Sequence, residues 1–282
     1  MSDAALTRYY EASTGRFLRF GGSGRSLAIH RGLWPEGVTT PEAAAAEVNR
    51  RIVARLAALD APAPGLIRDL GCGVGGSLIH FAAAWPTARL DGVTLSPRQA
   101  ALGRRFAAAR GLAGRVTIRC GDFLRSGDGV PADLAADLAV AIESHVHAPS
   151  AAAFMAAARR HLAPGGHLVV VDDMLARPEA TLSPAEARLV ATFRRGWHLG
   201  HVPDAGELKA AAGLSCVHDE DLTPLLHLAR WRDRALRRVG PVADALGLGR
   251  WPLFSNMIGG NALTQAYRAG LMRYRLMIFR AT

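Results

Sequence analysis

The chain has 282 residues, half of them apolar, which suits one large domain with a substantial buried core. It contains no run of about eighteen apolar residues, so we expect no membrane-spanning helix. Charged residues occur near the start, where a secretory signal would have an apolar stretch, so we expect no such signal. Cys72, Cys120 and Cys216 lie too far apart for a disulfide framework or a zinc site. We interpret them as small buried side chains and expect a cytoplasmic protein.

The formal net charge is +10, a balance that attracts nucleic acid, anionic membranes or anionic substrates. Nearly all of the positive charge is arginine, since Lys209 is the only lysine. The dense basic group at 230–238 has one tryptophan and lacks the repeated aromatic residues that bind single strands. We therefore expect a small-molecule substrate and no nucleic-acid partner. Peripheral contact with a membrane and assembly of identical copies both remain open.

The predicted elements begin with a helix over 41–59, where Thr40 is a candidate N-cap and Pro41 occupies the first helical position. From residue 66, short apolar runs alternate with helical stretches. Strands are predicted at 66–70, 89–93, 116–120, 137–142 and 167–171, and helices at 76–85, 97–110 and 151–162. This alternation predicts a parallel sheet with helices on both faces.

After residue 173 the pattern loosens. Helices are predicted at 181–197 and 204–212, followed by a short strand at 214–218. A long helical insertion is predicted at 223–269 and a closing strand at 271–279. The region after residue 173 therefore combines two further strands with helical segments.

A glycine-rich loop, Asp69-Leu70-Gly71-Cys72-Gly73-Val74-Gly75-Gly76, follows a predicted strand and opens a helix. Glycines let a ligand approach the backbone closely, and the helix start presents free N–H groups. The spacing does not match the phosphate-binding P-loop. It also departs from Gly-x-Gly-x-x-Gly, because the last pair of glycines falls one residue early.

The segment from Asp69 to Gly75 resembles the first motif of the class I S-adenosylmethionine-dependent methyltransferases, an acidic residue, one residue, then Gly-x-Gly-x-Gly. The segment Thr94-Leu95-Ser96-Pro97-x-Gln99 resembles the second-strand motif of the branch with sterol and tocopherol methyltransferases and cyclopropane fatty-acid synthases. Thr94 stands where most families have the ribose-binding carboxylate. Asp91 lies three residues too early for that role, and we interpret it as a surface or strand-end residue.

Gly121-Asp122-Phe123 resembles the adenine-binding motif of these enzymes, in which the carboxylate accepts from the exocyclic amine. Upstream, Tyr9-Tyr10-Glu11 resembles the start of the same enzymes, where an N-terminal helix covers the cofactor. The segment from His30 to Trp34 resembles their His-x-Gly-aromatic segment.

The segment Ala141-Ile142-Glu143-Ser144-His145-Val146-His147-Ala148-Pro149 resembles the sterol C-methyltransferase signature Ala-Ile-Glu-x-x-x-His-Ala-Pro. It ends the fourth strand, where open α/β sheets bind their ligands. His145 and His147 alternate at a predicted strand end, so we expect only His147 to face the pocket. We interpret Asp172 and Asp173 as the polar end of the fifth strand and expect no metal.

The resemblance implies an α/β, Rossmann-like fold with a seven-stranded, mostly parallel sheet, an antiparallel last strand and a helical cap. Residues 1–60 would form an N-terminal cap segment. Residues 61–282 would form the core, with cap insertions at about 174–203 and 222–268.

It also implies methyl transfer from S-adenosylmethionine to a small, largely apolar acceptor, namely C-methylation of an isoprenoid double bond in a sterol or prenyl chain. Glu143 and His147 are the expected catalytic residues. The alternative is O- or N-methylation of a natural-product phenol, quinol or amine, with His147 as the base. The expected cofactor-binding residues are Tyr10, Asp69, Gly71, Gly73, Gly75, Thr94, Leu95, Gln99, Asp122 and Phe123.

Overall fold

The computed structural model describes residues 27–125, 127–128, 134–210, 213–228 and 252–282, without the side chains of 252–256. Tyr10 and the basic group at 230–238 lie outside these ranges, so what was expected of them stays a prediction. None of the helices in these ranges has the length and hydrophobicity of a membrane span.

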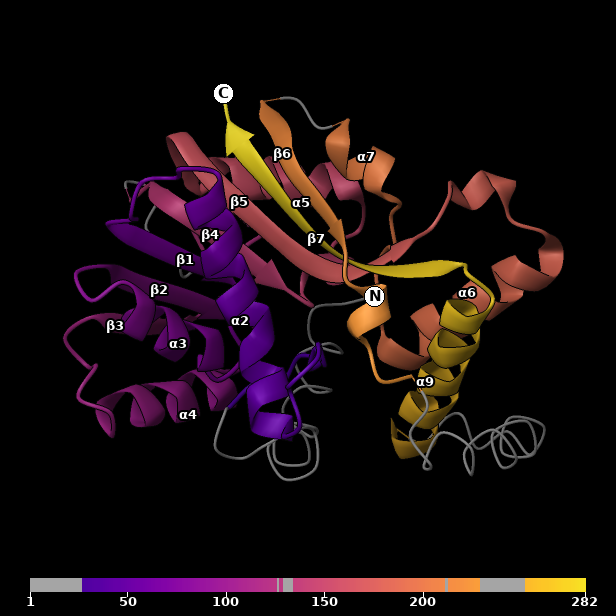
Figure 1. The fold of residues 1–282 in the computed structure, drawn as a ribbon, viewed down its shortest axis with the longest axis horizontal. Helices are drawn as coiled ribbons and strands as arrows, with labels where there is room; N and C mark the ends of the chain where they lie inside the picture. The colour runs from indigo at the N-terminus through magenta and orange to yellow at the C-terminus, as the bar shows by residue number, and fades with distance from the viewer. Residues whose placement is uncertain (1–26, 126, 129–133, 211–212, 229–251) are drawn as a thin grey trace.

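A seven-stranded sheet with strand order β3-β2-β1-β4-β5-β7-β6 forms the centre of the fold (Figure 1). β1 to β5 pair in parallel, whereas β7 runs antiparallel to both β5 and β6. The strands are β1 (Leu66–Leu70), β2 (Arg89–Thr94), β3 (Val116–Cys120), β4 (Ala136–Ile142), β5 (Leu162–Leu175), β6 (Leu214–Asp221) and β7 (Met272–Ala281). This arrangement confirms the predicted fold class.

Three of the helices in the first part of the chain begin at a side-chain cap that the sequence supplies. Thr40, Ser96 and Ser150 accept backbone N–H groups at the starts of α2, α4 and α5. The helices are α2 (Pro41–Ala58), α3 (Gly76–Ala84), α4 (Pro97–Ala108), α5 (Ala151–Arg160), α6 (Pro184–Trp197), α7 (Ala205–Lys209) and α9 (Pro252–Arg268). Short 3-10 turns are η1 (His145–His147), η2 (Glu179–Thr181) and η3 (Thr223–Leu225).

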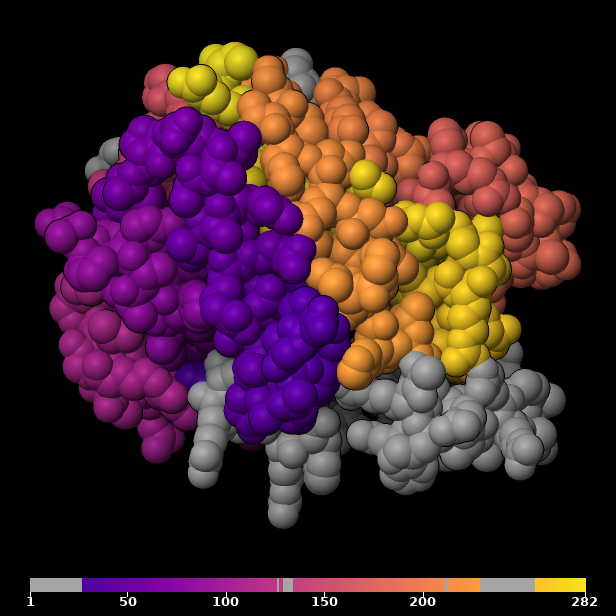
Figure 2. Space-filling view, in the orientation of Figure 1, coloured from indigo at the N-terminus to yellow at the C-terminus, as the bar shows by residue number. Residues whose placement is uncertain are grey.

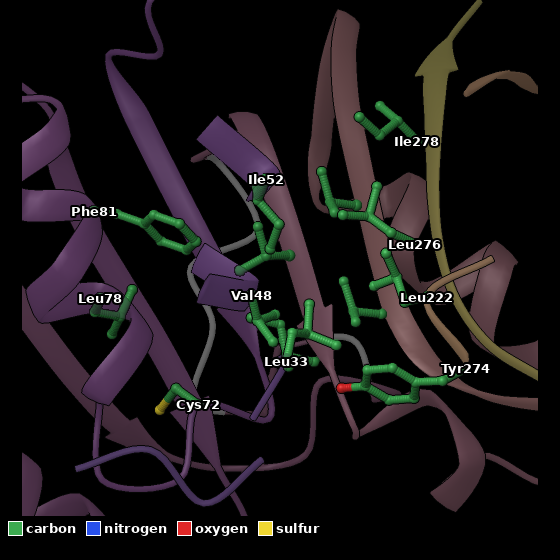
Figure 3. Packing of buried hydrophobic residues seen from close by; sticks show 14 of the residues in the cluster. Leu33, Val48, Ile52, Cys72, Leu78, Phe81, Leu222, Tyr274, Leu276 and Ile278 are labelled. Carbon is green, nitrogen blue, oxygen red and sulfur yellow. The ribbon is translucent and has the colours of Figure 1, made fainter. Parts of the chain in front are cut away.

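One apolar cluster joins α2 and α3 to the strands from β3 across to β7. Ile52 of α2, Phe81 of α3 and Ile278 of β7 are each fully buried in it (Figure 3). Burying such a side chain contributes about 1.5–3 kcal/mol. Leu33, from the segment before α2, belongs to the same cluster and anchors that segment to the core.

Several predicted boundaries differ from the structure. β5 extends past the predicted end at residue 171 because β7 pairs with it over nine residues, from His167 to Leu175. The predicted helix 181–197 is divided into η2 and α6, since Ser183 and Glu186 form a capping box at the start of α6. Of the predicted insertion 223–269, the structure describes η3 and α9.

Two interpretations of single residues were wrong. Asp91 is buried within β2 and forms ion pairs with Arg68 (3.2 Å) and Arg119 (3.0 Å), so it is neither a surface nor a strand-end residue. Its two arginine partners make its burial tolerable. Cys120 is exposed at the end of β3, whereas Cys72 is buried as predicted and Cys216 is half-buried.

Candidate active site

A cavity of about 500 Å³ opens at the carboxyl ends of the parallel strands, where the chain order reverses between β1 and β4. That volume lies within the usual range for small-molecule sites. Its lining includes most of the residues singled out from the sequence, namely Asp69, Gly71, Gly73, Thr94, Leu95, Gln99, Phe123, Glu143 and His147. The fold therefore brings together motifs that are far apart in the sequence.

The glycine loop after β1 requires backbone conformations that favour glycine. Gly71 and Gly73 have φ of +98° and +54°. A Cβ on Gly71 would lie 2.5 Å from the Cβ of Ser144, so the loop packs directly against the end of β4. Gly75 caps α3 with φ of +79° and packs towards Ile118 of β3 rather than lining the cavity.

Asp69 is a buried carboxylate in the cavity wall, with 3% of its surface exposed. Among the described residues, none donates a hydrogen bond to its carboxylate. Burial raises its pKa to about 7. A buried carboxylate beside a glycine loop and a helix start fits a ligand that carries both positive charge and hydrogen-bonding groups. S-adenosylmethionine, with its sulfonium and ammonium groups, is such a ligand, so the residues present fit the implied cofactor.

The second-strand motif lines the cavity with its threonine side chain held in place. The Thr94 hydroxyl donates to Gln99 Oε1 at 2.7 Å, and Ser96 caps the helix that carries Gln99. Only one of the two side chains of the adenine motif lines the cavity. Phe123 lines the cavity, whereas the Asp122 carboxylate accepts the N–H of Leu124 at 2.9 Å and lies outside the lining. A role for Asp122 in adenine binding stays a prediction.

Glu143 follows the last residue of β4 and has a left-handed backbone, with φ of +50°. Its Oε1 accepts two hydrogen bonds of 2.9 Å, from the backbone N–H of Arg31 and from the hydroxyl of Tyr274. Burial raises the pKa of Glu143 to about 7, although the positive charge of Arg31 opposes that shift. A carboxyl group in a cavity can accept or donate a proton near neutral pH when its pKa is close to 7.

A cluster of charged and aromatic side chains surrounds Glu143. The Arg31 guanidinium donates twice to the Asp173 carboxylate, both at 2.5 Å, and lies over the rings of Tyr267 and Tyr274. The Tyr267 hydroxyl also donates to Asp173. Arg31 lies within the predicted His-x-Gly-aromatic segment, but neither its side chain nor the two tyrosines were predicted to take part in the site. Their contacts join the segment before α2 to β5, α9 and β7, which no local sequence pattern reveals.

His145 and His147 lie in the 3-10 turn η1 and not on a strand end, because β4 ends at Ile142, so the predicted strand-like alternation of the two side chains is wrong. Nevertheless, His147 lines the cavity, and burial lowers its pKa to about 4. His145 is buried, and its Nδ1 lies 2.7 Å from Asp172 Oδ2. Asp172 and Asp173 thus each have a protein partner.

The segment 27–34 covers the cavity from the glycine loop to η3. A Cβ on Gly76 would lie 2.6 Å from the carbonyl oxygen of Leu27. At the other end, Trp34 N–H donates to the Leu225 carbonyl at 2.8 Å, and the Trp34 ring stacks on His227 with centroids 4.4 Å apart. In Figure 2 the indigo part of the chain, which also includes α2, lies against the orange part that contains η3.

Comparisons with known proteins find similarity to methyltransferases. A family model described as a methyltransferase domain matches residues 67–166. The O-methyltransferase rstn1 of Aspergillus nomiae is 31% identical over 184 residues, which cover 64% of this chain and 76% of that protein. A probable chloroplastic tocopherol O-methyltransferase of Oryza sativa subsp. japonica is 34% identical over 139 residues, or 48% of this chain. The match spans only 37% of the length of that relative.

The fold has similar solved structures. The geranyl diphosphate C-methyltransferase from Streptomyces coelicolor A3(2), in complex with Mg²⁺, geranyl diphosphate and S-adenosyl-L-homocysteine, aligns with a TM-score of 0.70. The alignment covers 99% of this chain and 97% of that one, at 21% sequence identity. At this level of identity the likeness concerns the fold.

Proposed function

The chain belongs to the class I S-adenosylmethionine-dependent methyltransferases, and we propose that it C-methylates an isoprenoid double bond in a small, largely apolar acceptor. When bound, S-adenosylmethionine supplies an electrophilic methyl group. The residues proposed to hold this cofactor are Tyr10, Asp69, Gly71, Gly73, Gly75, Thr94, Leu95, Gln99, Asp122 and Phe123. Asp69 carries this part of the proposal, because its buried carboxyl group lines the cavity and a cationic ligand would stabilise its ionised form.

The character of the remaining lining supports an apolar acceptor. Apolar side chains from α6 and α9 and from the segments beside them line the cavity; they are Phe193, Trp197, Leu199, Leu226, Leu228 and Leu263. α6 and α9 pack against each other beyond the sheet (Figure 1). We therefore propose that these helices belong to the predicted cap over the core, of which the structure describes residues 27–60, 174–203, 222–228 and 252–268. Such a cap positions the acceptor and excludes water.

The observation that carries the choice of reaction is the buried Glu143 carboxylate in this apolar cavity. An olefinic acceptor must lose a proton after its carbon skeleton gains a substituent, so the reaction needs a base inside the cavity. Oε1 of Glu143 is held by Arg31 and Tyr274, and no described residue donates to Oε2. We assign Oε2 as the proton acceptor. A pKa of about 7 suits a base that works near neutral pH.

O- or N-methylation of a phenol, quinol or amine is the second candidate, and His147 favours it. Its lowered pKa leaves the imidazole unprotonated at neutral pH, so it can accept a hydrogen bond or a proton from an acceptor hydroxyl or ammonium, although a pKa of about 4 makes it a weak base. Similar proteins include a tocopherol O-methyltransferase as well as a geranyl diphosphate C-methyltransferase, which supports keeping both chemistries under test.

Glu143→Gln and His147→Ala separate the two candidates. With isoprenoid, phenol and amine acceptors assayed by mass spectrometry, Glu143→Gln should lower turnover by roughly 10²–10⁴-fold on an olefin. Calorimetric affinity for S-adenosylmethionine should stay nearly intact. Glu36→Gln, which alters an exposed carboxylate, is the matched control.

If the acceptor is a phenol, His147→Ala should be the crippling change instead. Raising the pH should then partly restore its activity, because the phenol ionises without a base. An olefin has no acidic proton to lose before methylation and would show no such rescue. A fully active Glu143→Gln enzyme would contradict the proposed role of Glu143 with any acceptor.

A further inference from the structure

We propose that Tyr274 is a positioning residue that keeps the Glu143 carboxylate ionised and directs its second oxygen to the acceptor. This inference rests on the proposed role of Glu143 as the base. Tyr274 lies in β7, is fully buried and does not line the cavity, so it acts on Glu143 and not on the acceptor (Figure 3).

The geometry fixes one carboxylate oxygen and leaves the other without a protein donor. The Tyr274 hydroxyl and the Arg31 N–H both donate to Oε1, each at 2.9 Å, from β7 and from the segment 27–34. The backbone N–H of Glu143 donates to the Val171 carbonyl at 2.8 Å, which ties the residue to β5. Backbone and side chain are thus both restrained, and Oε2 is the oxygen available for proton transfer.

A hydrogen bond to the charged form of a carboxyl stabilises that form. The pKa of the Tyr274 phenol lies well above its usual value, mainly because of burial, so the hydroxyl keeps its proton and remains a donor. Removal of the Tyr274 hydroxyl takes away a hydrogen bond that stabilises the ionised form of Glu143 and not its protonated form. The carboxyl would then hold its proton to higher pH and would be a poorer base at neutral pH.

The charges around Glu143 have opposing effects on its ionisation, so hydrogen-bond donors such as Tyr274 matter for it. Arg31, from the covering segment, favours ionisation, whereas Asp172 and Asp173, from β5, oppose it. The positive charge of Arg31 is shared with Asp173, to which it donates two hydrogen bonds. The other groups facing this cluster are Tyr267 of α9, bonded to Asp173, and His145 of η1, bonded to Asp172.

The test is an infrared difference titration of the unliganded full chain, which needs no acceptor. The carbonyl band of protonated Glu143 is assigned by its loss in Glu143→Gln. In Tyr274→Phe, the midpoint of this band should move upward by on the order of one pH unit. Tyr267→Phe is the matched control, because it removes a buried hydroxyl of the same cluster that donates to Asp173 instead.

Site-specific 3-fluorotyrosine at position 274 gives a shift of opposite sign. Its phenol is more acidic and donates more strongly, so the Glu143 midpoint should fall, even if Tyr274→Phe proves too unstable to titrate. An unchanged midpoint in both Tyr274 variants, or an equal upward shift in Tyr267→Phe, would overturn the inference. Full activity of Glu143→Gln would instead overturn the proposed function, and the titration would still decide the role of Tyr274.

Discussion

Asp69 combines deep burial with a lack of described hydrogen-bond donors, a state that costs free energy in the unliganded protein. Its pKa is raised from 3.8 to about 7 by burial. Between these pH values the folded chain binds a proton that the unfolded chain does not. Stability therefore falls as pH rises through this window, and the loss is complete above about pH 7.

Asp69→Asn should stabilise the unliganded protein at about pH 8 by roughly 2–4 kcal/mol, and much less at about pH 5. Chemical denaturation at the two pH values measures this difference. Asp137→Asn is the control, because Gly65 and Leu66 donate to that carboxylate and its loss should destabilise at both pH values. Destabilisation by Asp69→Asn at both pH values would show that Asp69 is a structural residue with partners of its own.

The residues of the site that carry a local motif could be predicted, whereas their partners could not. Asp69, Glu143 and His147 each lie in a recognisable segment, and all three line the cavity. Tyr274 and the Arg31 side chain carry no motif signal. Their importance arises because β7 and the segment 27–34 meet at Glu143, and that contact depends on the whole fold.

At the scale of elements, boundaries set by local chemistry were predicted well. β1 and β3 have the predicted bounds, and α2 starts after its predicted Thr40 cap. Boundaries that depend on pairing with a strand far away in the sequence were not predicted well. β5 gains residues 172–175 from its pairing with β7, and η1 replaces a predicted strand end because the chain turns at Glu143. Secondary-structure signals within a segment do not report which strand comes to lie beside it.

The contact between the glycine loop and the end of β4 leads to a prediction for Gly71→Ala. The new Cβ would meet the Cβ of Ser144 at 2.5 Å in a left-handed backbone, so the loop and the Glu143 turn must separate. We expect at least about a tenfold loss of S-adenosylmethionine affinity, which corresponds to about 1.4 kcal/mol. Isothermal calorimetry provides the measurement.

Gly111→Ala is the matched control for that variant. Gly111 also has positive φ, at +70°, but its Cβ would meet nothing within 4 Å. It should lower stability by about 1 kcal/mol and leave cofactor affinity unchanged. If the two alanine variants lost affinity equally, backbone strain alone would explain the result, and the close packing of loop and strand end would have no special part in binding.

The charge of the whole molecule and the charge of its cavity have opposite signs. The chain carries a net charge of +10. The described lining of the cavity nevertheless has four carboxylates, those of Asp69, Glu143, Asp172 and Asp173, against the single guanidinium of Arg31, while burial keeps His147 neutral. Arg31 is already bound by Asp173, so it has little charge to offer an anionic ligand. Surface charge therefore says little about the acceptor.

An uncharged acceptor should consequently be preferred over its phosphorylated counterpart. Bringing a diphosphate into a cavity lined by carboxylates costs desolvation and repulsion, and both are larger there than in water. With methyl-labelled cofactor, we expect kcat/KM for a prenyl alcohol or prenyl quinol to exceed that for the matching diphosphate by at least about tenfold, a difference of about 1.4 kcal/mol in transition-state binding. Assays at low and high salt distinguish the effect of the cavity on the diphosphate from that of the basic surface, because attraction to the surface weakens as salt rises. A preference for the diphosphate that persists at high salt, with or without added Mg²⁺, would mean that the acceptor's charged end lies outside the described lining.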